Sequence, residues 1–195
     1  MKSATNRDLL VKAAASRFHR FGLPASSIAN VANDAGIPPG NVYYYFRTKD
    51  ALAIAVQDYW QRCTADALDE IDARHVDARA RLLEYLDRSE RNAPLYAVSG
   101  CPIAALSRDF RGGGSSLQAL AGAIFEQQAE WLARQFAATG VPQREQMTAA
   151  WAILTAIQGG IGLAHATHSE TPFRAAIADA RQRVASLTPD QKRDD

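Results

Sequence analysis

Hydrophobic residues recur at three- and four-residue steps along most of the chain, and no stretch shows the strict alternation that is typical of a strand. The clearest stripe runs from Leu52 through Val56, Tyr59 and Cys63 to Ile71 and predicts one long helix. Further helices are expected around Leu82–Leu86, over 102–110, from Ser115 or Ser116 through Phe136, over 143–168 and over 172–187. The pattern therefore predicts an all-α fold.

Two shorter helices are expected before this series, joined by a glycine turn. Ser26 or Ser27 can cap the first helix, which carries an apolar stripe and stops before Gly36, a residue that tolerates positive φ. Pro38 and Pro39 then open the second helix, where a missing backbone N–H is harmless. Two short helices around such a turn form a helix-turn-helix, whose second helix enters the DNA major groove.

Side chains of the second short helix divide between a core face and a DNA face. Val42 and Phe46, four residues apart, anchor the helix to the core and turn Tyr43 and Tyr44 outward, while Tyr45 lies closer to the core face. Exposed neighbouring aromatic residues favour a binding partner. We therefore expect the two outward tyrosines to contact phosphates and sugars.

Other polar residues near this helix are candidates for further DNA contacts. Asn41 can match adenine with its carboxamide, and Lys49, in the first turn of the next helix, can hold a phosphate together with backbone N–H groups. Thr5, Arg7 and Ser27 are weaker phosphate candidates. The predicted DNA-binding set comprises Ser27, Pro38, Gly40, Asn41, Tyr43, Tyr44 and Lys49.

Charge is distributed unevenly although the chain's net charge is only +1. Residues 1–50 carry seven Lys/Arg against three Asp/Glu, and residues 51–195 carry fifteen against eighteen. The N-terminal quarter is therefore +4 and the remainder is −3. A basic N-terminal part (the head, residues 1–50) on a less basic remainder (the body) is expected where only the head contacts DNA phosphates.

The N-terminal region resembles the TetR family of transcriptional regulators. The resemblance covers roughly residues 7–53 and rests on the segments RFHRFG, SSIANVANDAGI and PPGNVYYYF, followed by the Thr48-Lys49 pair. Pro39 departs from the family, which more often has a polar or basic residue there. The resemblance implies a helix-turn-helix domain over 1–50 and a helical ligand-binding and dimerisation domain over 51–187. The charged residues 188–195 are expected to form a flexible tail.

Small residues within the helix expected over 143–168 favour a close approach by another helix. Ala149, Ala152, Ala156 and Gly160 recur at helical steps, and each interior glycine in the segment costs roughly 1 kcal/mol relative to alanine. The partner is either a helix of the same subunit or a second subunit. Members of the TetR family dimerise through their last two long helices, which favours a homodimer on a pseudo-palindromic operator.

A small-molecule effector is the partner expected for the helical body. Its predicted ligand-binding residues are Tyr59, Tyr85, Cys101, Phe125, Gln128, Trp151 and Gln158, with His165 on a neighbouring stripe. Any of them can instead be an ordinary core or interface residue. Since His165 has no second ligand at metal-binding spacing, we expect no metal site and no cofactor.

Cys101 precedes a proline-opened helix, where the positive end of the helix dipole favours a reactive thiolate. The segment resembles the Gly-Cys segment of one branch of the TetR family, some of whose members sense electrophiles or oxidants through cysteine. A small buried cysteine is the alternative. Cys63 is expected in the core.

The function expected from these features is ligand-responsive transcriptional repression. A cysteine-dependent enzyme is an alternative, but the sequence lacks a βαβ frame, a phosphate loop and a catalytic triad. A ligand-free architectural DNA-binding protein would not need so large a body. We also expect no membrane span and no signal peptide, hence a cytoplasmic protein that is not an enzyme.

Overall fold

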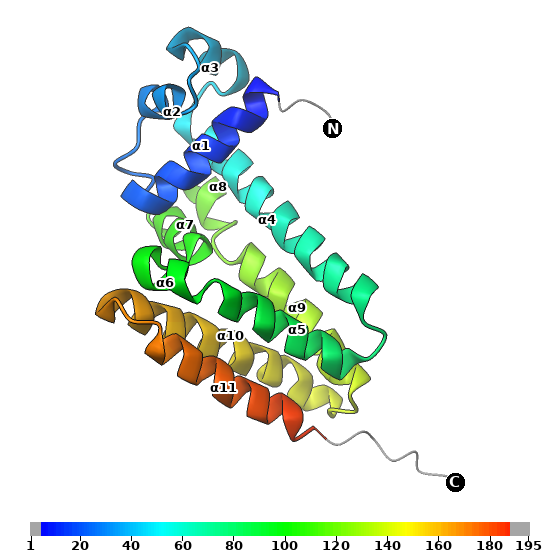
Figure 1. The fold of residues 1–195 in the computed structure, drawn as a ribbon. Coiled ribbons are helices and arrows are strands. Elements are labelled where there is room, and N and C mark those ends of the chain that lie inside the picture. The colour runs from blue at the N-terminus through cyan, green and yellow to red at the C-terminus, as the bar shows by residue number, and fades with distance from the viewer. Residues whose placement is uncertain (1–4, 188–195) are drawn as a thin grey trace. The chain divides into compact units, whose positions relative to one another are not determined.

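The computed structural model describes residues 5–187, which form eleven α-helices and no strand (Figure 1), so the predicted all-α fold is confirmed. The predicted tail over 188–195 lies outside the described residues. The chain forms two compact units, one made of residues 5–63 and 101–124 and the other of residues 64–100 and 125–187. The first unit therefore combines the N-terminal helices with a segment from the middle of the chain.

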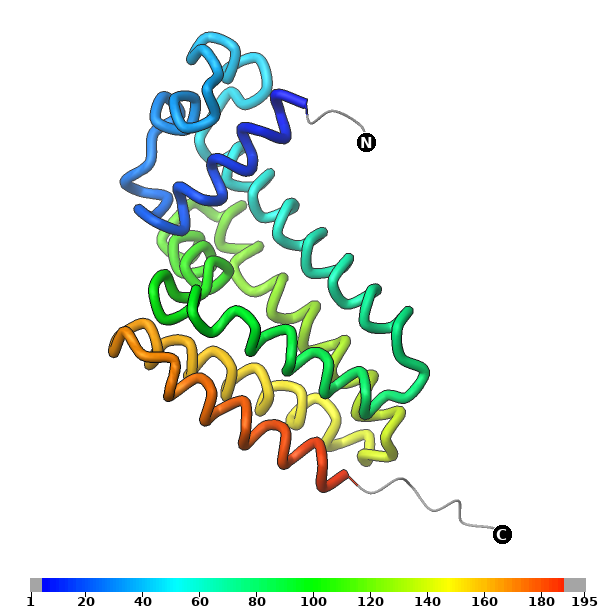
Figure 2. Tube along the Cα trace, in the orientation of Figure 1, coloured from blue at the N-terminus to red at the C-terminus, as the bar shows by residue number. Residues whose placement is uncertain are grey.

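The first unit is built around three N-terminal helices, α1 (Asn6–Phe21), α2 (Ile28–Asp34) and α3 (Pro39–Tyr45), and the beginning of α4 (Lys49–Arg74). Two later helices, α7 (Pro102–Arg111) and α8 (Ser115–Gln118), complete it. Figure 2 shows α7 returning beside the C-terminal end of α1, and the two helices are in contact. Leu106, Phe110 and Leu117 join the same buried core as Leu10, Phe18, Val31, Val42 and Leu52.

Local signals in the sequence set the boundaries of the short helices. Ser27 caps α2 and forms a capping box with Asn30, and Gly36 adopts φ +66° after the helix ends. Pro38 and Pro39 open α3, as the sequence predicts. Of the two serines, Ser27 is the cap, because the Ser26 hydroxyl is buried and donates to the Gly22 carbonyl.

The second unit is a helical bundle that contains the remainder of α4 together with α5 (Ala78–Arg91) and α6 (Ala93–Ser99). Later in the chain, α9 (Ala123–Ala138), α10 (Gln143–Thr167) and α11 (Thr171–Ala185) complete the bundle. Within it, α10 packs against α11 and α6, and α11 packs against α5. Ion pairs from Arg181 to Asp87 and Glu90 fasten α11 to α5.

The helix expected from Ser115 or Ser116 through Phe136 is interrupted, and that prediction was wrong in its continuity. Residues 119–122 form turns between α8 and α9, and the cap of α8 is Gly114 without a side-chain hydrogen bond. Gly122 lowers helix propensity at this point. In addition, the buried Gln57 amide donates to the Leu120 carbonyl at 3.3 Å and competes with helical hydrogen bonding there.

Gly160 packs within the subunit rather than toward a second copy. A Cβ atom at this position would lie 3.0 Å from the Ala176 Cβ and 3.1 Å from the Phe173 Cα, both on α11. The small-residue contact predicted at Gly160 is therefore the intramolecular alternative. By contrast, a Cβ added at Gly159 or Gly162 meets no atom within 4 Å.

One helix, α10, bears on the expectation that the chain has no membrane span. Among the described residues, this one helix is long and apolar enough to cross a membrane by length and composition. The same two criteria are met by core helices of soluble proteins, so they are weak evidence for a span. Ala150, Ile153, Ile157 and Ile161 form its buried stripe.

Candidate nucleic-acid interface and effector residues

The exposed face of α3 gathers most of the predicted DNA-binding residues. Val42 and Phe46 are buried, which turns Tyr43 and Tyr44 outward with 57% and 85% of their surface exposed. The Tyr44 and Tyr45 rings meet edge to face at 5.0 Å, and Tyr45 packs against the core as expected. Further exposed members of the set are Ser27, Pro38, Gly40 and Asn41.

Lys49 makes contacts that sequence reasoning did not foresee. Its ammonium group donates hydrogen bonds to the carbonyls of Leu23 and Pro24, at 3.0 and 3.2 Å. The side chain therefore ties the α1–α2 loop to the first turn of α4, and at most one ammonium N–H is left for a phosphate. Phosphate binding by Lys49 stays a prediction, now combined with a structural role. No short-range sequence signal indicates this contact, because the partners are 25 and 26 residues away.

The same loop is held from α7, and this contact also has no local sequence signal. The Asp109 carboxylate accepts a hydrogen bond of 2.7 Å from the Leu23 N–H, across 86 residues of sequence. Its side chain is only 10% exposed. Gly22 adopts φ +81°, and the N–H of the next residue, Leu23, points to this carboxylate. Asp109 and Lys49 thus bind the N–H and the carbonyl of the same residue, Leu23.

Two of the weaker phosphate candidates, Thr5 and Arg7, lie at or near the start of α1. Thr5 caps this helix and exchanges hydrogen bonds with Asp8, so its hydroxyl is engaged in a capping box. The Thr5 hydroxyl and then its backbone N–H stabilise the Asp8 carboxylate and hold its pKa below the ordinary value of 3.8. Arg7 is exposed, and its guanidinium lies 5.3 Å from the centre of the Phe46 ring.

The predicted effector residues fall into two groups. Tyr59 and Cys101 belong to the first unit, and Tyr85, Phe125, Gln128, Trp151 and Gln158 belong to the second. In the second unit the Tyr85 hydroxyl donates to Gln128 at 2.7 Å, and its ring packs beside Trp131 at 5.6 Å. Phe125 is one turn from Gln128 on α9. The structure therefore brings together Tyr85 and Gln128, with Phe125 nearby.

Trp151 and His165 do not face inward, which corrects their expected placement. Both side chains are exposed, and Trp151 retains 41% of its surface. The reason is the helical phase of α10, whose inward positions are held by neighbouring residues such as Ala150, Leu154 and Ala164. Gln158 is half-buried.

Both cysteines of the first unit are half-buried, but they make different contacts. Cys101 caps α7, and its sulfur accepts a hydrogen bond from the Ala104 N–H at 3.5 Å. Cys63 is half-buried rather than fully in the core. Burial, and then a hydrogen bond with the Cys63 thiol, raises the pKa of the Tyr59 hydroxyl above its ordinary value of 10.0. Within residues 5–187 no three side chains are grouped to hold a metal ion.

Solved structures with the same fold cover nearly the whole chain. A TetR transcriptional regulator from Legionella pneumophila is 22% identical with a TM-score of 0.84, covering 94% of this chain and 99% of that one. The reduced form of NemR from E. coli is 18% identical with a TM-score of 0.79, covering 91% and 95%. At these identities the likeness shows the fold.

Sequence comparisons find relatives over nearly the whole chain and family models for its N-terminal and C-terminal parts. An uncharacterised HTH-type transcriptional regulator of Mycobacterium tuberculosis is 27% identical over 197 residues, covering 96% of this chain and 98% of the relative. Residues 10–56 match a family model described as bacterial regulatory proteins, tetR family. Residues 81–179 match another, described as transcriptional regulator LmrA/YxaF-like, C-terminal domain. The chain therefore belongs to the TetR family of transcriptional regulators, whose members are not enzymes.

Proposed function

We propose that this regulator is a repressor that binds a pseudo-palindromic operator as a homodimer and is released by a small-molecule effector. The observation that carries the DNA-binding part is the division of α3 between a buried and an exposed face. Val42 and Phe46 fix the helix to the core, and two adjacent tyrosines stand in solvent beside Asn41. Such a face can place hydroxyls on phosphates and a carboxamide on a base edge.

The homodimer is supported by the exposed side of α10. No charged residue occurs between positions 146 and 164, and Met147, Trp151 and Leu163 are exposed in the single chain. Gly159 and Gly162 also lie on this side and face open space. Since interior glycines weaken a helix by about 1 kcal/mol each, a closely approaching second copy gives them a reason to be there. A two-fold axis through this surface would present two α3 helices to one operator.

Effector control is proposed to act through α7. Tyr85 and Gln128 supply polar groups for an effector in the second unit, and Gln127 contributes a buried side-chain oxygen with no hydrogen-bond partner. The chain passes from α6 directly into α7, whose Asp109 holds the α1–α2 loop. Movement of α7 would therefore change the position of α2 and α3, and two heads with altered spacing would no longer fit adjacent major grooves.

Thiol sensing by Cys101 is a second candidate, supported by its place as the cap of α7. A sulfur that accepts a backbone N–H at a helix start is stabilised as a thiolate. Modification there would act on the same helix that carries Asp109. The cytoplasmic location expected from the sequence is part of this proposal, because reduced cysteines are typical of that compartment.

The DNA-binding proposal is tested by selecting an operator from genomic fragments and measuring its affinity by fluorescence anisotropy over a range of salt concentrations. Tyr43→Phe removes one hydroxyl and should weaken binding to all duplexes about equally, by roughly 0.5–1.5 kcal/mol. Asn41→Ala should instead reduce discrimination between operator and random DNA. Tyr45→Phe is the matched control, since that ring packs against the core.

The outcomes separate the roles clearly. If the Tyr43→Phe variant binds DNA with the parent's affinity while Asn41→Ala reduces discrimination as expected, the Tyr43 hydroxyl does not contact a phosphate. Unchanged binding in both variants would show that α3 does not enter the groove. A DNA-bound species with the mass of one protomer would contradict the homodimer.

A further inference from the structure

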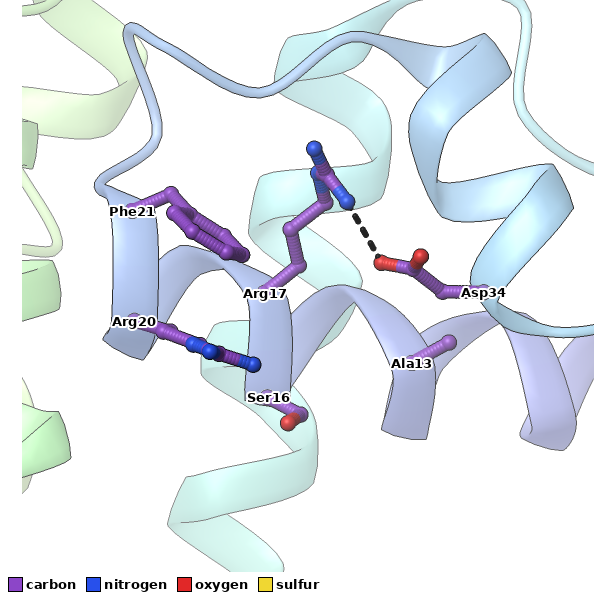
Figure 3. Close-up of a pocket in the computed structure, with 6 residues that line it drawn as sticks. All are labelled: Ala13, Ser16, Arg17, Arg20, Phe21 and Asp34. Atoms are coloured by element: carbon purple, nitrogen blue, oxygen red, sulfur yellow. Dashed lines mark hydrogen bonds and ion pairs between the residues drawn. The ribbon is translucent and has the colours of Figure 1, made fainter.

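A pocket of about 390 Å³ lies on the first unit between the C-terminal half of α1 and the end of α2 (Figure 3). It is lined by Ala13, Ser16, Arg17, Arg20, Phe21 and Asp34. These residues are outside the predicted DNA-binding and effector sets. The volume is within the range of small-molecule sites.

Two guanidinium groups and one aromatic ring dominate this pocket. The guanidinium carbons of Arg17 and Arg20 each lie 5.0 Å from the centre of the Phe21 ring. Figure 3 shows all three side chains extending from the same stretch of α1, with Asp34 reaching in from α2. Phe21 keeps 50% of its surface exposed, so an apolar surface lies beside two positive charges.

The positive charge in the pocket is only partly neutralised. One terminal nitrogen of Arg17 pairs with Asp34 at 2.7 Å, whereas its Nε atom is buried without a hydrogen-bond partner. Within residues 5–187, Arg20 forms no ion pair. The pocket therefore holds two cations against one carboxylate, and an incompletely satisfied guanidinium is a feature that a bound anion explains.

We propose that this pocket binds a small organic anion that carries a carboxylate on a planar apolar body. Arg20 and the remaining N–H groups of Arg17 would take the carboxylate, because the guanidinium fork matches its geometry. The exposed part of Phe21 would contact the apolar body. This site is separate from the effector residues of the second unit.

DNA is not the occupant that the geometry favours. Ser27 stands at the beginning of α2 and Asp34 at its end, so the pocket and the predicted phosphate contact are about 10 Å apart along a seven-residue helix. Asp34 also places a carboxylate in the pocket, which would repel a phosphodiester backbone. The same carboxylate would also repel a small anion, so the anion is expected on the Arg20 side of the pocket, which Figure 3 shows across Arg17 from Asp34.

The test measures binding of 1-naphthoate to the full-length protein without DNA, from the side-chain ¹H–¹⁵N signals of the arginine Nε groups. Saturable shifts of the Arg17 and Arg20 signals are expected, together with at least tenfold weaker binding of the neutral 1-naphthamide and of inorganic phosphate. Arg20→Gln should weaken naphthoate binding at least tenfold while leaving the Arg17–Asp34 ion pair intact. Arg47→Gln is the matched control, an exposed arginine of the same unit outside the pocket.

Three results would overturn the proposal. Equal binding of naphthoate and naphthamide would show that the arginines do not recognise charge. Unchanged naphthoate binding by a folded Arg20→Gln variant would place the anion elsewhere. A smaller salt dependence of operator binding in that variant would assign Arg20 to DNA phosphates. Because naphthoate binding is measured without DNA, failure of the repressor proposal leaves this test intact.

Discussion

Gly162→Leu gives the sharpest test of the proposed dimer surface, because the single chain tolerates the change. A Cβ at this position meets no atom within 4 Å in the same chain, so the protomer should keep its fold and gain most of 1 kcal/mol in helix propensity. In a dimer with closely packed α10 helices, an inserted side chain costs about 1–3 kcal/mol. Two-fold symmetry doubles this to about 2–6 kcal/mol, which raises the dimer Kd roughly 30-fold or more.

Sedimentation equilibrium measures the dimer Kd, and circular dichroism checks the helix content. Gly160→Ala is the matched control, because its Cβ would lie 3.0–3.2 Å from atoms of Phe173 and Ala176 on α11. This variant should lose fold stability while its association is retained. A Gly162→Leu protein with the parent's dimer Kd would refute the reasoning. So would a Gly162→Leu protomer that unfolds more easily than the Gly160→Ala protomer.

Three further predictions concern single side chains. Asp109→Ala should destabilise the protein by about 1–3 kcal/mol in urea unfolding, because the Leu23 N–H loses its acceptor. Asp109→Asn keeps an acceptor oxygen and should retain much of the stability. Equal losses of stability in the two variants would contradict this contact. The pKa of the Asp8 carboxyl, measured by NMR, should lie below 3.8. The stabilisation from its ionised form is therefore fully present above pH 3.8 and is lost as the pH falls through the lowered pKa. A pKa at or above 3.8 would argue against the capping box. Iodoacetamide should modify Cys101 faster than Cys63, and an equal rate would return Cys101 to a structural role.

Features encoded by neighbouring residues could be predicted from the sequence. Ser27, Gly36 and the Pro38-Pro39 pair set the ends of two short helices through local hydrogen bonding and backbone preferences. The outward direction of Tyr43 followed from helical periodicity alone. These predictions depend on three- and four-residue spacing, which a single sequence shows directly.

Features that depend on distant partners could not be predicted in this way. Lys49 was expected to face phosphate, but its ammonium contacts carbonyls in a loop more than twenty residues earlier. The break after α8 involves Gln57, from another helix. Trp151 was misplaced because α10 is apolar on several sides, so hydrophobicity alone does not distinguish its buried stripe from its exposed surface.

The return of α7 and α8 to the N-terminal helices limits how this protein can be recombined with its relatives. Leu106, Phe110 and Leu117 are part of the buried core that also contains Leu10 and Phe18. A gene fusion that transfers only residues 1–50 would leave the apolar surfaces beneath these residues uncovered. Chimeras that exchange DNA specificity should therefore keep the native α1 and α4 core positions and graft only the exposed residues of α3. A fragment intended to fold alone would need residues 101–124 supplied in the same polypeptide.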